Sequence, residues 1–147
     1  MLSSKARYAL RALVALARSE TGHGTAGELA AAADCPRKFL EAILLELARR
    51  NLVVSRRGKF GGYSLARPAR QISFAEVIRA TDGPLALAPC VSRLAFRKCD
   101  DCPDLATCPI REALLRARDA TAEVLEGYSV GEAAAGAGAE LLHPGGG

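Results

Sequence analysis

The sequence predicts a mainly α-helical fold with one small β-hairpin. Apolar residues recur at helical spacing over residues 4–50 and again over residues 110–128. Between them, two short runs that favour strands flank the stretch RRGKFGG, which is typical of a hairpin turn. Half of the 147 residues are apolar, so the chain is long enough for one domain with a hydrophobic core, or for a small domain with an appended element.

Two helices are predicted before residue 34. Either serine of the pair at positions 3–4 can cap the first helix, which runs to about Ser19 and ends at the glycines that follow. Thr25 and Glu28 have the spacing of a capping box, in which each side chain accepts a hydrogen bond from the other residue's backbone N–H. This box opens a short helix over residues 26–33.

A third helix follows a tight break at residues 34–35. Pro36 suits its first position, because a proline ring fixes φ at a helical value where no N–H is needed. The helix is expected to continue through Arg50 and to close at Asn51 in a left-handed cap. Two helices joined by a short turn, the second beginning with polar residues, indicate a helix-turn-helix. Cys35, at that turn, is expected to be a small buried core residue.

A β-hairpin is predicted directly after the third helix. Residues 52–56 favour a strand, residues 57–62 a turn and residues 63–65 a returning strand. The tip is basic and rich in glycine, as in the wing of a winged helix-turn-helix. We therefore expect a winged helix-turn-helix domain followed by a long C-terminal dimerisation helix.

The wing carries residue types that suit contact with DNA. Arg56, Arg57 and Lys59 can reach phosphate oxygens or a minor groove, and glycines let the backbone approach phosphates closely. Taken singly, the glycines are equally consistent with an ordinary hairpin turn, and Phe60 with a cap on the core. The order of helix, turn, helix and basic hairpin favours DNA binding.

Charge is unevenly divided along the chain. Residues 1–70 carry thirteen Lys or Arg against five Asp or Glu, whereas residues 71–147 carry seven against eleven. A basic block in a folded region is either a solvated surface or the electrostatic footprint of a polyanion such as nucleic acid. The helix-turn-helix pattern favours the second interpretation.

The C-terminal half is predicted to hold two more helices. Ser73 and Glu76 form a second capping box, whose helix stops near residues 82–84, and Pro109 begins a long helix over residues 110–128. The apolar stripe of the long helix can pack within its own chain or on a second subunit, and the half-site geometry of a helix-turn-helix favours the second subunit. The stripe residues are Ile110, Leu114, Ala117, Thr121, Val124, Leu125 and Tyr128. The predicted organisation is a DNA-binding domain over 1–83, a cysteine-rich loop over 84–109, the dimerisation helix over 110–128 and a disordered tail over 129–147.

The sequence contains no apolar run of the length that crosses a bilayer. The N-terminal apolar segment is interrupted by arginines at helical spacing and lacks a small-residue cleavage site, so it is interpreted as a helix rather than a secretory signal. We therefore expect a cytoplasmic protein that does not bind membranes. In that compartment a cluster of cysteines indicates metal binding or redox sensing rather than structural disulfides.

Four of the five cysteines fall within the stretch CVSRLAFRKCDDCPDLATCP, residues 90–109. Their spacing is Cys90-x8-Cys99-x2-Cys102-x5-Cys108, so the four thiols can converge if the loop folds back on itself. A structural zinc site usually offers two closely spaced pairs, and this loop has one. Iron–sulfur clusters accept thiolates at less regular spacing, so they are favoured, with zinc and thiol–disulfide sensing as alternatives.

Three segments of the sequence resemble one known family. The segments SSKARYALRALVALA, LAAAADCPRKFLEAILLELARRNLVVSRRGKFGGYSLARP and ISFAEVIRATDG look like the winged-helix regulators that include IscR, NsrR and CymR. The resemblance covers about residues 1–128, and the FLE triplet, the RRGKFGGY wing and the cysteine loop appear in family order. It implies a dimeric transcription factor that acts on palindromic or near-palindromic operators in double-stranded DNA.

The resemblance also implies which residues contact DNA. Phe39 and Glu41 occupy the positions at which the recognition helix of the family contacts base edges. A glutamate can accept from a cytosine amino group and an aromatic ring can lie against a thymine methyl. The family commonly has Tyr at the position of Phe39, and inward packing is the alternative for this ring. The expected DNA-binding set is Pro36, Arg37, Lys38, Phe39, Glu41, Arg56, Arg57, Lys59, Gly61, Gly62 and Tyr63.

The cofactor implied by the resemblance is an iron–sulfur cluster. In the family the cluster is built mostly from three cysteines of this loop, often with a fourth ligand of another type or from elsewhere in the dimer. Here there are four candidates, Cys90, Cys99, Cys102 and Cys108, over a longer span than usual. The interval between Cys102 and Cys108 matches the family, and the choice between a 2Fe–2S and a 4Fe–4S cluster stays open.

These observations lead to one functional hypothesis. The chain is expected to be a transcriptional regulator, acting as a repressor, whose operator binding responds to redox state, nitric oxide or iron–sulfur status through the cysteine loop. Regulation by zinc or by a thiol–disulfide switch in the same fold is the alternative. Electron transfer and thiol oxidoreductase activity are less well supported, because no βαβ pattern accompanies the C-x2-C motif and a basic wing would serve neither. No arrangement of Ser, His and Asp indicates a hydrolase, so an enzyme is not expected.

Overall fold

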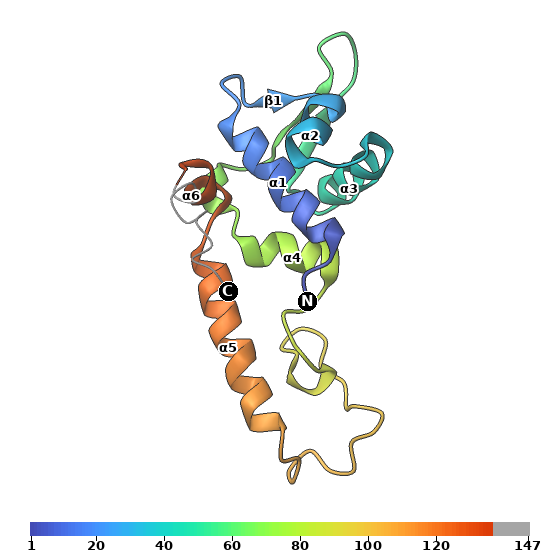
Figure 1. Cartoon of the computed structure of the whole chain (residues 1–147), viewed down its shortest axis with the longest axis vertical. Coiled ribbons are helices and arrows are strands. Elements are labelled where there is room, and N and C mark those ends of the chain that lie inside the picture. Colours follow the sequence, from blue (N-terminus) through green and yellow to red (C-terminus); the bar gives the residue numbers. More distant parts are fainter. Residues whose placement is uncertain (137–147) are drawn as a thin grey trace, which may run out of the picture.

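The computed structural model describes residues 1–136, which form a helical domain and a long helix that projects from it (Figure 1). The elements in chain order are α1 (Ser4–Arg18), β1 (His23–Gly24), α2 (Ala26–Ala33), α3 (Arg37–Arg49), β2 (Val53–Arg56), β3 (Gly62–Leu65), η1 (Ala69–Gln71), α4 (Phe74–Asp82), η2 (Pro89–Val91), α5 (Arg111–Gly127) and α6 (Val130–Ala134). The mainly helical fold with a small β-hairpin is therefore as the sequence predicts. Within the described residues, no helix has the length and apolar character to cross a membrane.

The first helices begin at the caps that the sequence predicts. The Ser3 hydroxyl accepts a hydrogen bond from the N–H of Ala6 at 3.0 Å, and Thr25 forms the complete capping box with Glu28. Pro36 lies one position earlier than expected, as the N-cap of α3. Asn51 adopts the left-handed conformation, with φ of 57°, that closes a helix. These local bonds fix where α1, α2 and α3 begin and end.

The sheet has three antiparallel strands in the order β1-β3-β2. The hairpin pairs Val53 with Leu65 and Arg56 with Gly62, as the predicted wing requires. β1 is an addition, because the sequence analysis took these positions only as the end of α1. Two residues are too short for a strand pattern to be recognised, and the pairing of His23 with Ser64 depends on a contact distant in sequence.

The core lies around α1, which packs against α2, α3, α4 and α6 (Figure 1). Each helix contributes its apolar face to one cluster, as its periodicity predicts. The largest fully buried side chains are Leu13, Leu16, Leu40, Ile43, Leu44, Leu47, Leu52, Ile72, Val77, Val91 and Val130. Cys35 joins this cluster with 9% of its surface exposed, in agreement with its predicted role. The orientation of α3 is thus set by buried leucine and isoleucine side chains.

The prediction of a disordered tail from residue 129 is wrong for residues 129–136. Ser129 and Glu132 form a capping box for α6, and Val130 is fully buried in the core. The N–H of Val130 donates to the carbonyl of Ile72 at 2.8 Å, and the Arg18 guanidinium donates to the carbonyls of α6 at its C-terminal end. The prediction failed because it was based on the Ala- and Gly-rich composition and did not consider the capping box and the buried Val130. The rest of the predicted tail, residues 137–147, lies outside the described residues.

Candidate DNA interface and cysteine loop

The N-terminal turn of α3 presents polar and aromatic side chains to solvent. Arg37, Lys38, Phe39 and Glu41 are exposed, as is Pro36 before them, whereas the next apolar positions of the helix face the core. A recognition helix enters the major groove by its N-terminal end, and its polar residues there contact base edges. The five residues predicted for this helix therefore lie together on an uncovered surface.

Phe39 and Glu41 already have partners within the protein. Phe39 is 43% exposed and meets the ring of Tyr8 edge to face, with the centroids 5.8 Å apart. It therefore neither packs inward completely nor stands free. The Glu41 carboxylate accepts from the Arg37 guanidinium at 3.1 Å, one helical turn away. Glu41 can therefore contact a base only if its carboxylate binds the base and Arg37 together, or if this exposed ion pair breaks.

The wing presents cationic side chains at its tip. Arg56, Arg57, Lys59 and Phe60 are all exposed, and Phe60 is 84% exposed, which excludes the alternative that this ring caps the core. The Lys59 ammonium lies 5.9 Å from the centroid of the Phe60 ring, at the limit for a cation–π contact. Tyr63 is half-buried on β3 against the core.

The glycines of the wing are required by the backbone itself. A Cβ atom on Gly61 would lie 2.7 Å from the carbonyl oxygen of Arg56, and one on Gly62 would lie 2.6 Å from the carbonyl oxygen of Gly24. Gly62 also has a φ of 149°, which L side chains rarely adopt. These positions therefore have a structural role in the turn, in addition to any approach to phosphate.

An open cleft separates the base of the wing from the N-terminus of α2. It is lined by Arg56 and Lys59 on the wing side and by Thr25 and Glu28 on the helix side. Free N–H groups at a helix N-terminus and cationic side chains both favour phosphate, although Glu28 opposes it here. The same end of the molecule thus carries α3, the wing and this cleft, far from the cysteine loop in Figure 1.

The cysteine loop connects α4 to α5 and buries one of its four thiols. Cys90 is 4% exposed, on η2, whereas Cys99, Cys102 and Cys108 are half-buried. Burial and the neighbouring Cys99 raise the pKa of the Cys90 thiol, and Arg111 opposes this effect.

The loop supplies the donors of a metal site without forming one in this conformation. Four thiols are suitable ligands for an iron–sulfur cluster or zinc. Among residues 1–136, however, no three Cys, His, Asp or Glu side chains gather closely enough to hold a metal ion. Binding by three or four of these cysteines would therefore require the loop to change its conformation.

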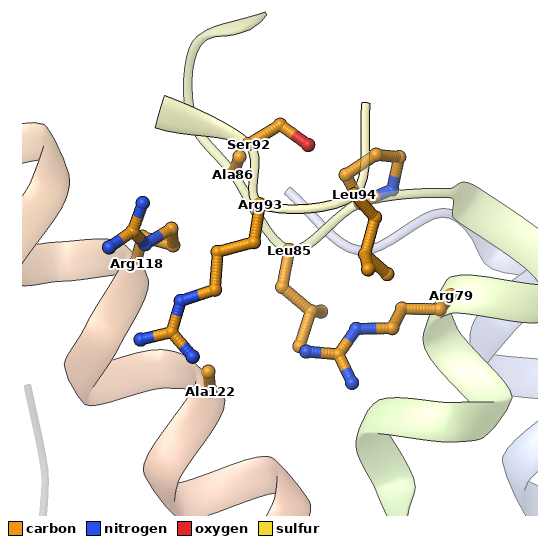
Figure 2. Close-up of a pocket in the computed structure, with 9 residues that line it drawn as sticks. Arg79, Leu85, Ala86, Ser92, Arg93, Leu94, Arg118 and Ala122 are labelled. Carbon is orange, nitrogen blue, oxygen red and sulfur yellow. The ribbon is translucent and has the colours of Figure 1, made fainter. Parts of the chain in front are cut away.

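Arginines of α5 hold the loop by its backbone. Arg111 Nη2 donates to the carbonyl of Cys90 at 3.3 Å, and Arg118 Nη1 donates to the carbonyl of Val91 at 2.9 Å. Arg93 of the loop pairs with Asp119 at 2.6 Å, and Arg118 also donates to this carboxylate. The hydrogen bond from Arg118, with a smaller contribution from Arg93, lowers the pKa of Asp119. Figure 2 shows Arg93 and Arg118 at a small pocket between the loop, α4 and α5.

Sequence reasoning missed these arginines, because it assigned a role only to the apolar stripe of α5. The available signal was their interval of seven residues, which puts Arg111 and Arg118 on the same side of a helix after two turns. When a helix comes directly after a cysteine loop and has arginines along one side, those arginines are candidates for contact with the loop.

The predicted dimerisation stripe divides into two groups. Ile110 and Val124 are 64% and 67% exposed and Thr121 is also exposed, whereas Leu125 packs on the core of its own domain. Tyr128 lies edge to face on Phe74, with the centroids 5.2 Å apart. The remaining stripe residues, Leu114 and Ala117, are half-buried. Of the 17 residues of α5, only Ala122 is buried, so most of this helix has no partner in the protomer.

The sequence and the fold are similar to those of known proteins. Residues 2–136 match the model of the Rrf2 family, described as an iron-dependent transcriptional regulator. This chain belongs to the Rrf2 family. An rrf2-like HTH-type transcriptional regulator of Rhodobacter capsulatus is 45% identical over 116 residues, which cover 76% of this chain and 77% of that one.

Solved structures of Rrf2-type regulators share the fold. CymR, the global cysteine regulator of B. subtilis, superposes with a TM-score of 0.74 and 28% identity, covering 92% of this chain and 96% of CymR. IscR of T. potens superposes with a TM-score of 0.73 over 99% of this chain and 93% of IscR, and its 22% identity supports the fold alone. The chain is thus a transcriptional regulator of the Rrf2 family and not an enzyme, and the electron-transfer and oxidoreductase alternatives are set aside.

Proposed function

We propose that this Rrf2 regulator is a homodimer that binds operator DNA with α3 and the wing. The state of the cysteine loop changes its affinity for DNA. The observation that carries the proposal is the uncovered cationic surface formed by the start of α3 and the wing. Arg37 and Lys38 supply charge beside the base-reading positions, and Arg56, Arg57 and Lys59 supply charge at the wing tip. Together they suit one duplex approached from one end of the molecule.

The second subunit is proposed to cover α5. Ile110, Thr121 and Val124 lie uncovered on a helix that buries one residue within its own protomer. Exposed apolar side chains along one helix are stabilised when a symmetric copy packs against them. Two copies joined through α5 would carry two recognition helices, as palindromic operators require.

An iron–sulfur cluster is the cofactor that we propose for the loop, with Cys90, Cys99, Cys102 and Cys108 as candidate ligands. Support comes from the donor set and from the Rrf2 family, whose printed description is iron-dependent. When bound, a cluster supplies an iron centre whose state depends on redox conditions. Zinc would use the same thiols, and a thiol–disulfide switch would use a pair of them.

The DNA interface is tested by an operator gel shift with a salt titration. Arg57→Ala and Lys59→Ala should each weaken binding to all DNA sequences and reduce the slope of log K against log salt by about one unit for each lost phosphate contact. Arg116→Ala removes an equally exposed arginine from α5 and serves as the matched control. Equal loss of affinity in the wing variants and the control would contradict the proposed surface.

The cofactor is tested on protein purified without air, by its absorbance spectrum and by analysis of iron, sulfide and zinc. A cluster should give visible absorbance with iron and sulfide in comparable amounts, and this absorbance should be lost in Cys102→Ser and in Cys108→Ser. Protein that stays colourless and metal-free after reconstitution would contradict the cluster. Zinc without iron would support the zinc-binding alternative.

A further inference from the structure

The ring of Phe39 needs support to keep one orientation at the start of α3. Phe39 is the third residue of the helix and is 43% exposed, whereas the side chain of Leu40 after it is completely buried. Burial of Leu40 fixes the helix, but it leaves the Phe39 ring free to rotate about its own χ angles. A side chain that contacts a base edge has to be held in one geometry by the groups around it.

Tyr8 of α1 supplies this support. The centroids of the two rings are 5.8 Å apart and the ring planes meet at 88°. This edge-to-face arrangement is favoured because the positive edge of one ring meets the negative face of the other. Tyr8 and Phe39 belong to different helices, so the contact depends on the packing of α1 against α3 (Figure 1).

The Tyr8 ring is itself held in place. It is half-buried and packs on the hydrophobic core, next to Ala9, which is completely buried. Lys5 lies one turn earlier on the same face of α1, and its Nζ pairs with the carboxylate of Glu46 in α3 at 2.6 Å. α1 and α3 are therefore joined by the aromatic pair near the start of α3 and by an ion pair further along it. Tyr8 is a fixed wall for the Phe39 ring rather than a second mobile side chain.

We propose that Tyr8 is a positioning residue for operator recognition, which holds the Phe39 ring in the orientation that contacts a base and so sets the preference at that operator position. The base edge that presents an apolar group in the major groove is that of thymine, through its methyl group. This inference deepens the proposed function and rests on it, because it names a residue outside α3 and the wing that determines which operator is bound.

The strength of an aromatic pair sets the size of the expected effect. An edge-to-face contact changes an equilibrium by about two- to tenfold. Loss of the Tyr8 ring lowers the fraction of protein in which Phe39 is correctly oriented, and operator affinity falls by the same factor. Neither ring is charged, so affinity for non-specific DNA and the slope of log K against log salt should stay unchanged.

The positioning itself is tested by NMR on the full chain without DNA. We expect nuclear Overhauser effects between the rings of Tyr8 and Phe39, and scalar couplings that report one χ1 rotamer for Phe39. Tyr8→Leu should give averaged couplings at Phe39, whereas Tyr8→Phe keeps the ring and should preserve the single rotamer. Averaged couplings in the unaltered protein would overturn the proposal, and so would a single rotamer that persists in Tyr8→Leu.

The effect on recognition is tested by binding-site selection from random duplex DNA. Phe39→Ala should lose the preference for thymine at one position of each half-site, and Tyr8→Leu should weaken the preference at that same position. Tyr8→Phe should restore it. The double variant Tyr8→Leu with Phe39→Ala should bind like Phe39→Ala alone, because the two residues act through one contact. Effects that add in full, or that fall on different operator positions, would overturn the proposal.

Val14→Ala is the matched control for loss of stability. Val14 is also a half-buried residue of α1 that packs on the core, but it borders an open groove with Ala32 of α2 and Phe74 of α4. This variant should lower the unfolding temperature and leave base preference unchanged. If Val14→Ala and Tyr8→Leu altered base preference alike, the effect would come from reduced stability, and the positioning role would be excluded.

The outcomes separate this inference from the proposed function. If the unaltered protein selected no DNA, the proposed function would fail and the inference with it. If Phe39→Ala changed the selected operator while Tyr8→Leu selected the same operator as the unaltered protein, the inference alone would fail. If Phe39→Ala left the operator unchanged while Arg57→Ala weakened binding, the wing would remain in the proposed interface and the inference would fail.

Discussion

The proposed DNA-binding end and the cysteine loop are held in place by different forces. Around α3, completely buried leucine and isoleucine side chains fix the helix, and backbone pairing fixes the wing. The loop has only Cys90, Val91 and Ser92 buried, and leaves Leu87, Leu94 and Phe96 exposed. Its position depends on a few hydrogen bonds from arginines of α5. This difference indicates that the proposed DNA-contacting surface stands on a rigid scaffold, while the loop can rearrange at little cost in buried apolar area.

The largest loss of stability is expected from a substitution in the core beneath α3. Leu44→Ala removes a fully buried side chain, and we expect it to lower the free energy of unfolding by about 2–5 kcal/mol. Leu45→Ala, at the neighbouring position that is 54% exposed, should change it by less than about 0.5 kcal/mol. Urea denaturation measures both variants. Equal effects would mean that α3 is not held by its buried face.

A second pair of variants compares α6 with α5. Val130 is fully buried in the core, so Val130→Ala should cost about 2 kcal/mol in thermal or urea unfolding. Val124 is 67% exposed, and Val124→Ala is expected to act on association instead, raising the dimer dissociation constant in sedimentation equilibrium. If Val130→Ala were without effect on unfolding, α6 would not belong to the core as described.

The attachment of the loop should depend on pH through Asp119. Arg118 and Arg93 lower the pKa of this carboxyl in the folded protein, so its contribution to stability is complete above the pKa of an unfolded aspartate. It is lost as the pH falls through the lower pKa of the folded state. The difference in unfolding free energy between the protein and Asp119→Asn should therefore shrink on acidification. A difference that stays constant with pH would show that Asp119 is not paired in solution.

The smallest effect on stability is expected at the exposed pair of Arg37 and Glu41. Glu41→Gln should change the free energy of unfolding by about 0.3 kcal/mol or less, because both side chains are solvated. It should nevertheless alter operator preference in a binding-site selection experiment, since Glu41 lies at the start of the recognition helix. Glu112→Gln breaks the similar pair with Arg116 on α5 and is the matched control. If Glu41→Gln and Glu112→Gln changed operator preference in the same way, a base-reading role for Glu41 would be excluded.

The elements that follow from local chemistry were predictable from the sequence. The capping box of Thr25 and Glu28 placed α2 at its observed bounds, helical periodicity placed α3, and the turn RRGKFGG placed the hairpin. The second box formed only in part, because the N–H of Glu76 donates to Ser73 while the Glu76 carboxylate binds Arg67. A partner distant in sequence had replaced the local one.

Features that depend on contacts distant in sequence were missed. β1 exists through its pairing with β3, and α6 is held because Val130 is buried in the core beside α1 and its N–H donates to the carbonyl of Ile72. The four loop cysteines were identified as a group by their spacing, but spacing says nothing of which thiols meet. The burial of Cys90 accompanies a turn closed on the carbonyl of Pro89, which has no recognisable motif.

Arg111 and Arg118 of α5 donate hydrogen bonds to backbone carbonyl oxygens, a group that every amino acid has. These two hydrogen bonds between the long helix and residues 90–91 therefore do not depend on the identity of the side chains there. A substitution of Cys90 can keep both bonds, so the proposed sensing chemistry and the attachment of the loop to α5 can be tested separately. Members with the same two arginines and a different residue at position 90 would keep the linkage while responding to another signal.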